Sequence, residues 1–229
     1  MILNKKFEIE ISVRDTSSEK ITHSVNLKKL QDYSWEEIAN IKNPGEVFEI
    51  GDEKTITLKN GDTLLIAIAG FNHDSDEKGN VLPITFTTVD LFSDRHPMDN
   101  TDTNKSGWKG CKMRKETMKN IFDLLPDDLQ AIIKNTYKGE TTDPLFLFNE
   151  VEVFGKTNYS KDNFGKQYDY YKVKHNRNKY MRDEEYSSGW WLRSPYASNS
   201  TYFCSVYSNG NANYINVSIS GGVAFGFCI

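Results

Sequence analysis

The sequence has 229 residues with a formal net charge of −4, and 13% of them are aromatic. This length fits one sizeable domain, and the acidic balance argues against a nucleic-acid partner, because phosphate recognition needs clustered Lys and Arg. No apolar run approaches the ~20 residues of a membrane helix, and the charged start Met1–Glu8 is unlike a signal peptide. We therefore expect a soluble protein, synthesised in the cytoplasm and not inserted in a membrane.

The first half of the chain predicts strands with one short helix. Residues 7–13 alternate apolar and polar side chains, which is typical of a half-buried strand. Ser34 followed by Glu37 is a capping-box pattern and predicts a short helix over residues 34–41. The strands expected next, in an antiparallel arrangement with polar turns between them, are 48–52, 54–58, 63–69 and 84–89.

The middle of the chain changes character after a polar loop at residues 93–110. Residues 113–125 place their apolar side chains at helical spacing. Pro126, followed by two acidic residues, predicts a second helix through Tyr137. Residues 146–154 return to the alternation of a strand.

The last third begins with a charged, Tyr-rich excursion at residues 156–188, which is long enough to be a functional loop or a poorly ordered one. Three short strands are expected after it: 202–207, 212–217 and 222–229. Strands first, helices in the middle and strands last predict an α+β fold. We assign residues 31–229 to one domain. Residues 1–30 are either an N-terminal strand or docking segment outside it, or a part of the same domain.

One acidic segment imitates a calcium-binding loop. Asp74, Asp76 and Gly79 have the spacing of such a loop. However, Lys78 occupies a ligand position, and Thr85 stands where a glutamate is needed. A polar hairpin turn is the better interpretation.

Catalytic patterns are also missing from the sequence. There is no nucleophile elbow, no HExxH and no phosphate-binding glycine loop. Glu150 and Glu152 would share one face of the predicted strand, which favours a solvated face over an acid–base pair. The histidines lie in four separate regions: His23, His73, His96 and His175. We expect neither a metal nor another cofactor.

The three cysteines have no metal-binding spacing. Cys204 and Cys228 lie in apolar, strand-like segments, so we expect them to be small core side chains like other buried cysteines. A Cys204–Cys228 disulfide is the alternative.

Trp190, Trp191 and Arg193 form the densest group of large side chains. Adjacent residues of a strand point to opposite faces, so one tryptophan can fill the core while the other packs under loops. Arg193 can hold backbone carbonyls or an acid such as Asp143. We interpret the group as a structural motif, with a ligand platform as the alternative.

Residues 196–229 contain no Asp, Glu, Lys, Arg or His, and Asn, Ser and Tyr are frequent among them. Antigen-binding loops use these three residue types, because Tyr gives contact area at low entropic cost and Ser and Asn give adaptable hydrogen bonds. This segment is therefore the first place to look for a binding function.

The sequence resembles an uncharacterised domain family of Firmicutes and their phages. The resemblance is carried by Trp-Trp-Leu-Arg-Ser-Pro at 190–195, by Ser-Asn-Gly at 208–210 and by Gly-Val at 222–223. Weaker landmarks occur upstream in the same order: 34–38, 50–52, 70–74, 107–108 and 124–126. The resemblance covers roughly residues 30–229.

The resemblance implies a C-type-lectin-like fold, similar to that of formylglycine-generating enzymes and of the variable proteins of diversity-generating retroelements. In such variable proteins, Asn codons of a C-terminal segment are mutated at adenines, which cannot produce Lys, Met, Trp, Gln or Glu. Residues 196–229 lack all five. The paired active-site cysteines of the enzymes and the calcium-binding triplets of lectins do not occur. The chain also ends in Phe-Cys-Ile, whereas the family more often continues with Arg-Pro.

By position, the resemblance implies a variable region at 196–220. Its ligand-facing candidates are Tyr196, Asn199, Ser200, Tyr202, Tyr207, Asn211, Asn213, Tyr214, Asn216, Ser218 and Ser220. Its scaffold candidates are Val206, Val217, Val223, Phe225 and Phe227.

We therefore expect a non-enzymatic protein that binds a protein or cell-surface ligand, in a phage particle or at a bacterial surface, either alone, as a homo-oligomer or in a virion assembly. The alternatives are a structural virion component and an enzyme related to the formylglycine-generating group.

Overall fold

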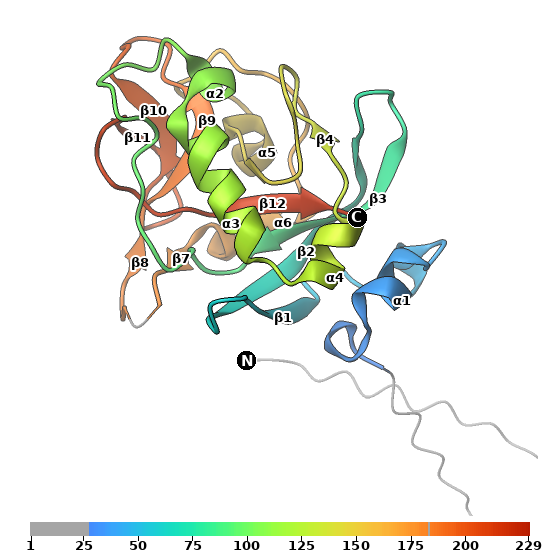
Figure 1. Cartoon of the computed structure of the whole chain (residues 1–229). Coiled ribbons are helices and arrows are strands. Elements are labelled where there is room, and N and C mark those ends of the chain that lie inside the picture. The colour runs from blue at the N-terminus through green and yellow to red at the C-terminus, as the bar shows by residue number, and fades with distance from the viewer. Residues whose placement is uncertain (1–27, 183) are drawn as a thin grey trace, which may run out of the picture.

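The computed structural model describes residues 28–182 and 184–229 (Figure 1). The predicted strand at residues 7–13 lies outside these residues, as does most of the 1–30 segment. Leu30, which is described, is buried in the core. Short helices and antiparallel strands make up the described part, so the α+β class is confirmed.

Most helices and strands are short, and β2 is the longest of them. The strands are β1 Glu53–Thr57, β2 Thr63–Ser75, β3 Val81–Thr88, β4 Thr136–Tyr137, β5 Thr142–Asp143, β6 Phe146–Leu147, β7 Lys179–Tyr180, β8 Ser187–Ser188, β9 Trp190–Pro195, β10 Tyr202–Val206, β11 Ala212–Asn216 and β12 Phe225–Cys228. The α-helices are α1 Trp35–Ala39, α2 Gly107–Gly110, α3 Met118–Leu124, α4 Asp127–Ile132, α5 Glu150–Phe154 and α6 Asp169–Lys172. Three 3₁₀ turns, η1 Leu30–Asp32, η2 Pro44–Glu46 and η4 Lys174–Arg177, and one π-helical turn, η3 Met113–Thr117, complete the described part.

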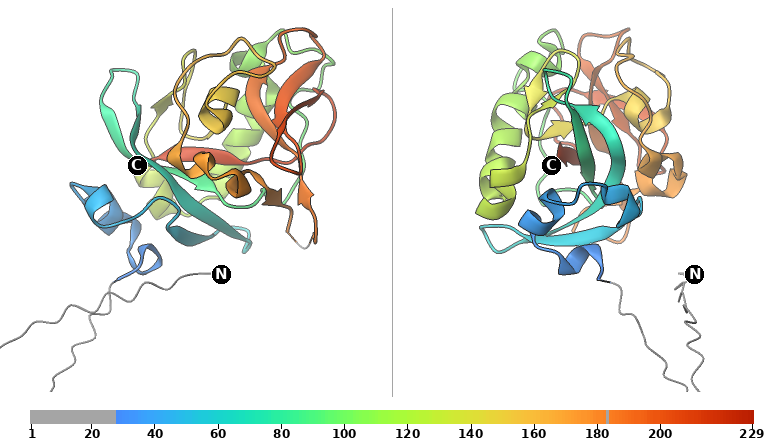
Figure 2. Two further views of the ribbon diagram at one scale, coloured as in Figure 1. Left: turned by 180° about the vertical axis from the view of Figure 1, so that it is seen from behind. Right: turned by 90° about the vertical axis from the view of Figure 1, so that its right-hand side faces the viewer.

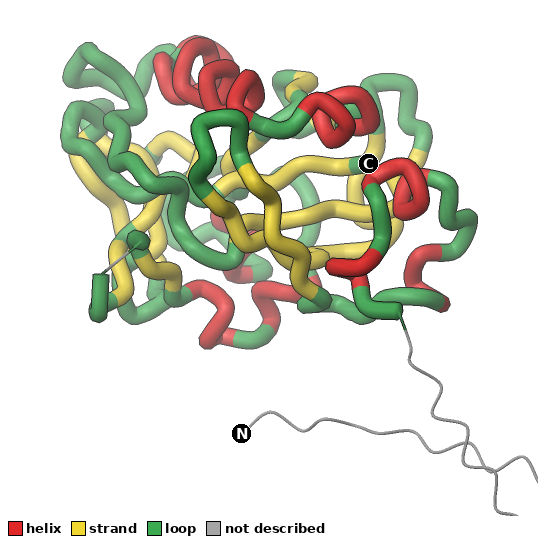
Figure 3. The backbone as a smooth tube through the Cα atoms, turned by 60° about the horizontal axis from the view of Figure 1, so that its bottom comes forward, coloured by secondary structure: helices red, strands yellow, loops and turns green. Residues whose placement is uncertain are grey.

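Two sheets organise the molecule. The larger sheet has the order β1-β2-β3-β12-β6, and the smaller has the order β11-β10-β9. The smaller sheet lies at the end of the molecule opposite the β2–β3 hairpin (Figures 1 and 2). In Figure 3 the strands occupy the middle of the molecule, and helices lie on either side of them.

The N-terminal predictions hold in part. Ser34 and Glu37 form both hydrogen bonds of the capping box and start α1. The strand expected at 48–52 is wrong, because Gly51 takes a positive φ of 90° and the chain turns there into β1. The other three strands of that series correspond to β1, β2 and β3.

The acidic segment after β2 forms the expected hairpin turn. The Asp76 carboxylate accepts hydrogen bonds from the backbone N–H groups of Lys78 and Asn80. This side chain therefore stabilises the β2–β3 connection itself.

The helices in the middle are shorter than predicted. Residues 113–124 are helical, as η3 followed by α3, and the loop before them ends in α2. The helix predicted through Tyr137 ends at Ile132, because the backbone of Ile133 is no longer helical and Thr136 pairs with Asp143 in the β4–β5 ladder.

The strand predicted at 146–154 is wrong beyond Leu147. Asn149 caps α5: its side chain accepts from the Glu152 N–H, and the Glu152 carboxylate accepts from the Asn149 N–H. The alternation of Glu and Val is thus a helical turn. Glu150 and Glu152, expected on a solvated face, are both fully buried.

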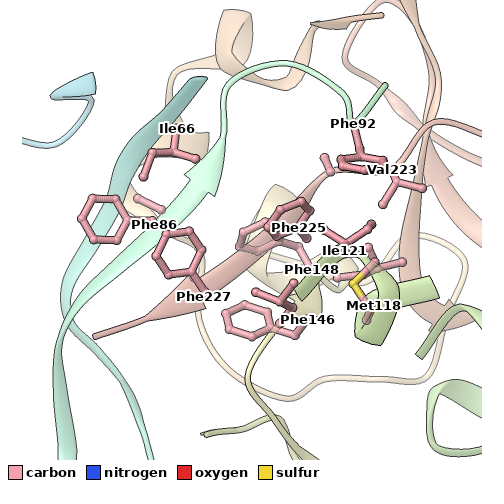
Figure 4. Packing of buried hydrophobic residues seen from close by; sticks show 14 of the residues in the cluster. Ile66, Phe86, Phe92, Met118, Ile121, Phe146, Phe148, Val223, Phe225 and Phe227 are labelled. Carbon is pink, nitrogen blue, oxygen red and sulfur yellow. The ribbon is translucent and has the colours of Figure 1, made fainter. Parts of the chain in front are cut away.

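The core is rich in aromatic side chains. Phe225 and Phe227 of β12 pack among Phe86 of β3, Phe146 of β6 and residues of α3 (Figure 4). The five scaffold candidates Val206, Val217, Val223, Phe225 and Phe227 are all fully buried. Cys204 and Cys228 are buried and free, so the disulfide alternative is wrong.

Candidate functional site

The register of the smaller sheet brings tyrosines together. Tyr202 of β10 lies opposite Asn216 of β11, and Cys204 lies opposite Tyr214. Opposed residues of neighbouring strands share a face, and so do alternate residues of one strand. Tyr202 and Tyr214 therefore project from the same face of the sheet.

Four rings form a tyrosine cluster on that face: Tyr159, Tyr196, Tyr202 and Tyr214. Tyr196 and Tyr214 stack in parallel, with ring centroids 4.5 Å apart. The Tyr159 ring meets Tyr214 edge-on at 5.1 Å, and the Tyr202 ring does so at 5.4 Å. Stacked and edge-on pairs of this kind are both favourable arrangements for aromatic rings.

The hydroxyl groups of the tyrosine cluster make no hydrogen bond among the described residues. The hydroxyl oxygens of Tyr159, Tyr196 and Tyr202 are not among the buried polar atoms that lack a partner. Tyr214 is 37% exposed, and the other three side chains are partly exposed. The cluster thus combines an ordered apolar body with hydroxyl groups that are free to bond a ligand.

Glu150 holds Tyr159 in the tyrosine cluster. Its carboxylate accepts hydrogen bonds from the backbone N–H groups of Asn158, Tyr159 and Ser160, at 2.7 to 3.1 Å. A buried carboxylate requires such donors, because an unpaired charge in the interior is costly. The bonds fix the loop that carries Tyr159 at the edge of the smaller sheet.

Asn104 holds the loop between β9 and β10. Its buried side-chain amide donates to the carbonyl oxygens of Tyr196, Asn199 and Tyr202, at 2.6 to 3.1 Å. The Ser200 carbonyl accepts from the Asn104 backbone N–H. A single side chain from the 93–110 loop therefore positions two of the four tyrosines.

Two of the candidate asparagines stabilise turns. The side-chain oxygen of Asn199 accepts from the N–H and hydroxyl of Thr201, and that of Asn216 accepts from the same groups of Ser218. Asn199 and Ser218 are exposed and Asn216 is partly buried, as these local turns permit.

The remaining candidates lie around the hairpin between β10 and β11 or at exposed loop positions. Tyr207 is 52% exposed and Asn211 is exposed at this hairpin. Asn213 pairs with Ser205, so it points to the face opposite Tyr214. Ser200 and Ser220 are exposed in loops. The structure thus gathers Tyr196, Tyr202 and Tyr214 and separates Tyr207, Asn211 and Asn213 from them.

The tryptophans of β9 are both fully buried. The Trp190 indole N–H donates to the Arg177 carbonyl, and that of Trp191 donates to the His96 carbonyl. The two rings thereby fasten different loops to the sheet.

Arg193 bonds the Leu147 carbonyl and both carboxylate oxygens of Glu152. It does not bind Asp143, which pairs with Arg114 instead. The difference follows from α5, because this unpredicted helix turns Glu152 toward β9.

Arg193 belongs to a buried ion cluster of four side chains: Asp74, Lys138, Glu152 and Arg193. Lys138 Nζ lies 2.6 Å from Asp74 Oδ1 and 3.0 Å from Glu152 Oε1. Each of the four side chains is at most 5% exposed. Two acids and two bases leave the cluster electrically balanced, as burial of charge requires.

A bulge in β2 aims Asp74 at the ion cluster. The register with β3 shifts between Phe71 and Asp74, and Asn72 takes a positive φ of 50°, which is uncommon for a residue other than glycine. His73 then stacks on Tyr168 at 3.7 Å, and its Nε2 donates to the Lys166 carbonyl. A pocket of about 280 Å³ opens beside His73 and Asp74.

The acids of the ion cluster are held ionised. Burial alone would raise the pKa of Asp74, but Lys138 and His73 hold it well below its usual range. Burial opposes ionisation of Glu152 too, and the charges of Arg193 and Lys138 lower its pKa. Burial, together with the nearby carboxylates, raises the pKa of Tyr168 well above its usual range, so its hydroxyl is a donor.

Sequence reasoning missed Tyr159, Glu150, Asn104 and Lys138. For Glu150 a signal existed, because Asn149 followed by Glu152 is a capping pattern that predicts a helix. The other three lie in segments whose apolar residues show neither helical nor strand spacing. Only the tertiary fold brings them to their partners.

Within residues 28–182 and 184–229, no group of three or more His, Cys, Asp and Glu side chains is placed to hold a metal ion. No helix of the described part is long and apolar enough to cross a bilayer.

Residues 78–229, about two thirds of the chain, match the family model of a domain of unknown function, DUF6273. No similar curated protein or solved structure was found.

Proposed function

Since the chain belongs to the DUF6273 family, a domain of unknown function, we propose a function from the site itself: this protein binds a protein or cell-surface ligand through the tyrosine cluster, without catalysis. All four tyrosines lie within the family match, whereas Asp74 lies before it.

The observation that carries the proposal is the set of four contacting tyrosine rings with free hydroxyls. Tyr side chains contribute a large contact area with little loss of side-chain entropy, and their hydroxyls bond polar groups of a ligand. The rings are already ordered by their mutual packing, by Glu150 and by Asn104. Such preorganisation favours affinity, because fewer side chains must be ordered on binding.

The test compares the cell binding of two variants in which tyrosine side chains at the surface are replaced by serine. The first carries Tyr202→Ser and Tyr214→Ser in the tyrosine cluster. The matched control carries Tyr186→Ser, because Tyr186 is 80% exposed and makes no ring contact with the tyrosine cluster. Fluorescently labelled protein is measured by flow cytometry on intact cells of a panel of Firmicutes.

We expect the cluster variant to lose at least about tenfold in apparent affinity, since an aromatic side chain in a binding surface contributes roughly 1–2 kcal/mol or more. The control should bind like the wild type, and the melting temperatures of all three proteins should agree within a few degrees. Binding that survives in the cluster variant, or binding to none of the cells, would refute the proposal.

We further propose that the fold is C-type-lectin-like and that residues 196–220 are diversified by a retroelement in a phage or prophage. Support comes from the interleaving of exposed candidates such as Tyr214 with buried residues such as Val206 and Val217. Asn199 and Asn216 hold turns, so we expect them to vary less than Tyr202 or Tyr214.

Sequencing the DNA that flanks the coding region tests this second part. We expect a near-copy of the segment that differs only at adenines, together with a reverse-transcriptase gene. If both are missing, the diversification proposal fails, and the binding proposal stands on its own experiment.

A further inference from the structure

Lys138 brings its amine close to the carboxyl group of Asp74. Lys138 Nζ lies 2.6 Å from Asp74 Oδ1. An amine at this distance from a carboxylate oxygen is roughly 3–3.5 Å from the carboxyl carbon, as reacting atoms are in a near-attack arrangement. Both side chains are buried, and the Phe146 ring lies 3.8 Å from Nζ.

We propose that Lys138 and Asp74 join in an intramolecular isopeptide bond. Within the ion pair, one proton moves from the ammonium group to the carboxylate, which gives a neutral amine and a carboxylic acid. Nζ then attacks Cγ of Asp74, the Nζ–Cγ bond forms and the Cγ–Oδ1 bond breaks. Oδ1 leaves as one water molecule with two of the three ammonium protons, so the reaction needs neither an oxidant nor a further reactant.

Glu152 is placed to move these protons. Its Oε1 lies 3.0 Å from Lys138 Nζ, within reach for general base catalysis. Arg193 binds both oxygens of the same carboxylate, so Glu152 remains ionised and able to accept a proton. Glu152 can then return the proton to the departing Oδ1.

Two donors face the oxygen that becomes negative when Nζ attacks. The hydroxyls of Tyr168 and Thr85 each lie 2.6 Å from Asp74 Oδ2. Fixed donors around a developing oxyanion lower the barrier of acyl transfer, particularly in a site that excludes water.

Burial of the site favours the isopeptide bond over the ion pair. The reaction replaces one buried ion pair with a neutral amide and leaves Glu152 paired with Arg193, so the cluster stays balanced with two fewer buried charges. The adjacent pocket, lined by Asp74 and Glu152, gives the released water a way out. The bond would join positions 64 residues apart in the sequence.

Intact mass spectrometry of the denatured full-length chain tests the inference. We expect a mass lower than that of the sequence by one water, about 18 Da. A proteolytic digest should contain a branched peptide in which Lys138 is linked to Asp74. A full-length sample with the unmodified mass would overturn the inference.

Two variants identify the source of a mass loss. Lys138→Arg keeps a cation at the site but cannot form the amide, so it should show the full sequence mass. Lys134→Arg, at an exposed lysine four positions away, is the matched control and should keep the loss. If the loss persists in Lys138→Arg, the dehydration lies elsewhere and the inference is wrong. Neither ligand binding nor its failure bears on this outcome.

Discussion

Lys179 is a fully buried lysine that bonds no carboxylate. Its Nζ donates to the carbonyl oxygens of Thr88 and Val89, and the rings of Tyr170, Tyr171 and Trp190 lie 5.5 to 5.8 Å away. Burial lowers the pKa of Lys179 to about 7, although Asp90 acts in the opposite direction. This is the behaviour of an ammonium group that has lost its hydration without gaining an equal counter-charge.

The stability of the protein should therefore rise with pH near neutrality. An unfolded lysine has a pKa of about 10.4, so above pH ~7 the unfolded chain binds more protons at this site than the folded chain. The free energy of unfolding should increase through this window by at most about 1.4 kcal/mol per pH unit. Urea denaturation at pH 6.5, 7.25 and 8 measures the slope.

Lys179→Met is the control, because it keeps an unbranched side chain only one atom shorter and removes the charge. The difference in unfolding free energy between wild type and variant should grow with pH in favour of the wild type. Parallel curves for the two proteins would show that Lys179 does not titrate in this range.

Single residues also show where sequence reasoning could reach. The composition of the charge-free segment marks it as a binding region, and the family resemblance implies three of its ligand-facing residues, Tyr196, Tyr202 and Tyr214. Tyr159 completes their cluster from a distant segment. The residues around it show neither helical nor strand spacing, so the sequence does not predict where its side chain lies. Such a residue becomes visible only when the fold is known.

At the scale of elements, α5 positions two side chains on which the tyrosine cluster and the ion cluster depend. Its residues alternate Glu and Val, which favours a strand, but the cap at Asn149 selects a helical turn. The turn sends Glu150 beneath the tyrosine cluster and Glu152 into the ion cluster. Local alternation was the weaker signal here, because a five-residue segment is too short for its period to decide.

Glu150→Gln should loosen the loop that α5 holds. A glutamine offers one acceptor oxygen where the carboxylate has two, and its amide group faces N–H donors. We expect a loss of about 1–3 kcal/mol in unfolding free energy, the cost of buried donors left without partners. Amide hydrogen exchange should accelerate at Asn158, Tyr159 and Ser160.

The matched variant Glu140→Gln changes an exposed glutamate and should leave both quantities unchanged. Unaltered exchange at the three amides in Glu150→Gln would mean that the loop is held by other contacts.

At the scale of the molecule, the order of strands and helices was sufficient to predict the α+β class. The pairing of the strands was not predictable, because β12 joins β3 and β6 across long stretches of sequence. The ion cluster also joins segments that are far apart in the sequence: β2, the segment after β4, α5 and β9. Sequence patterns show the spacing of apolar and polar residues within one helix or strand. These contacts join segments that are distant in the sequence, so they form only when the whole chain folds.

The position of β12 has a consequence for how the chain acquires its structure. This strand follows all others of the larger sheet in the sequence, yet it lies between two of them. During synthesis, β3 and β6 must therefore wait with unpaired edges until β12 has left the ribosome. Sheets dominated by such non-local contacts fold slowly, and their open edges invite aggregation. Folding of the larger sheet should therefore be sensitive to chaperones that cover exposed strands.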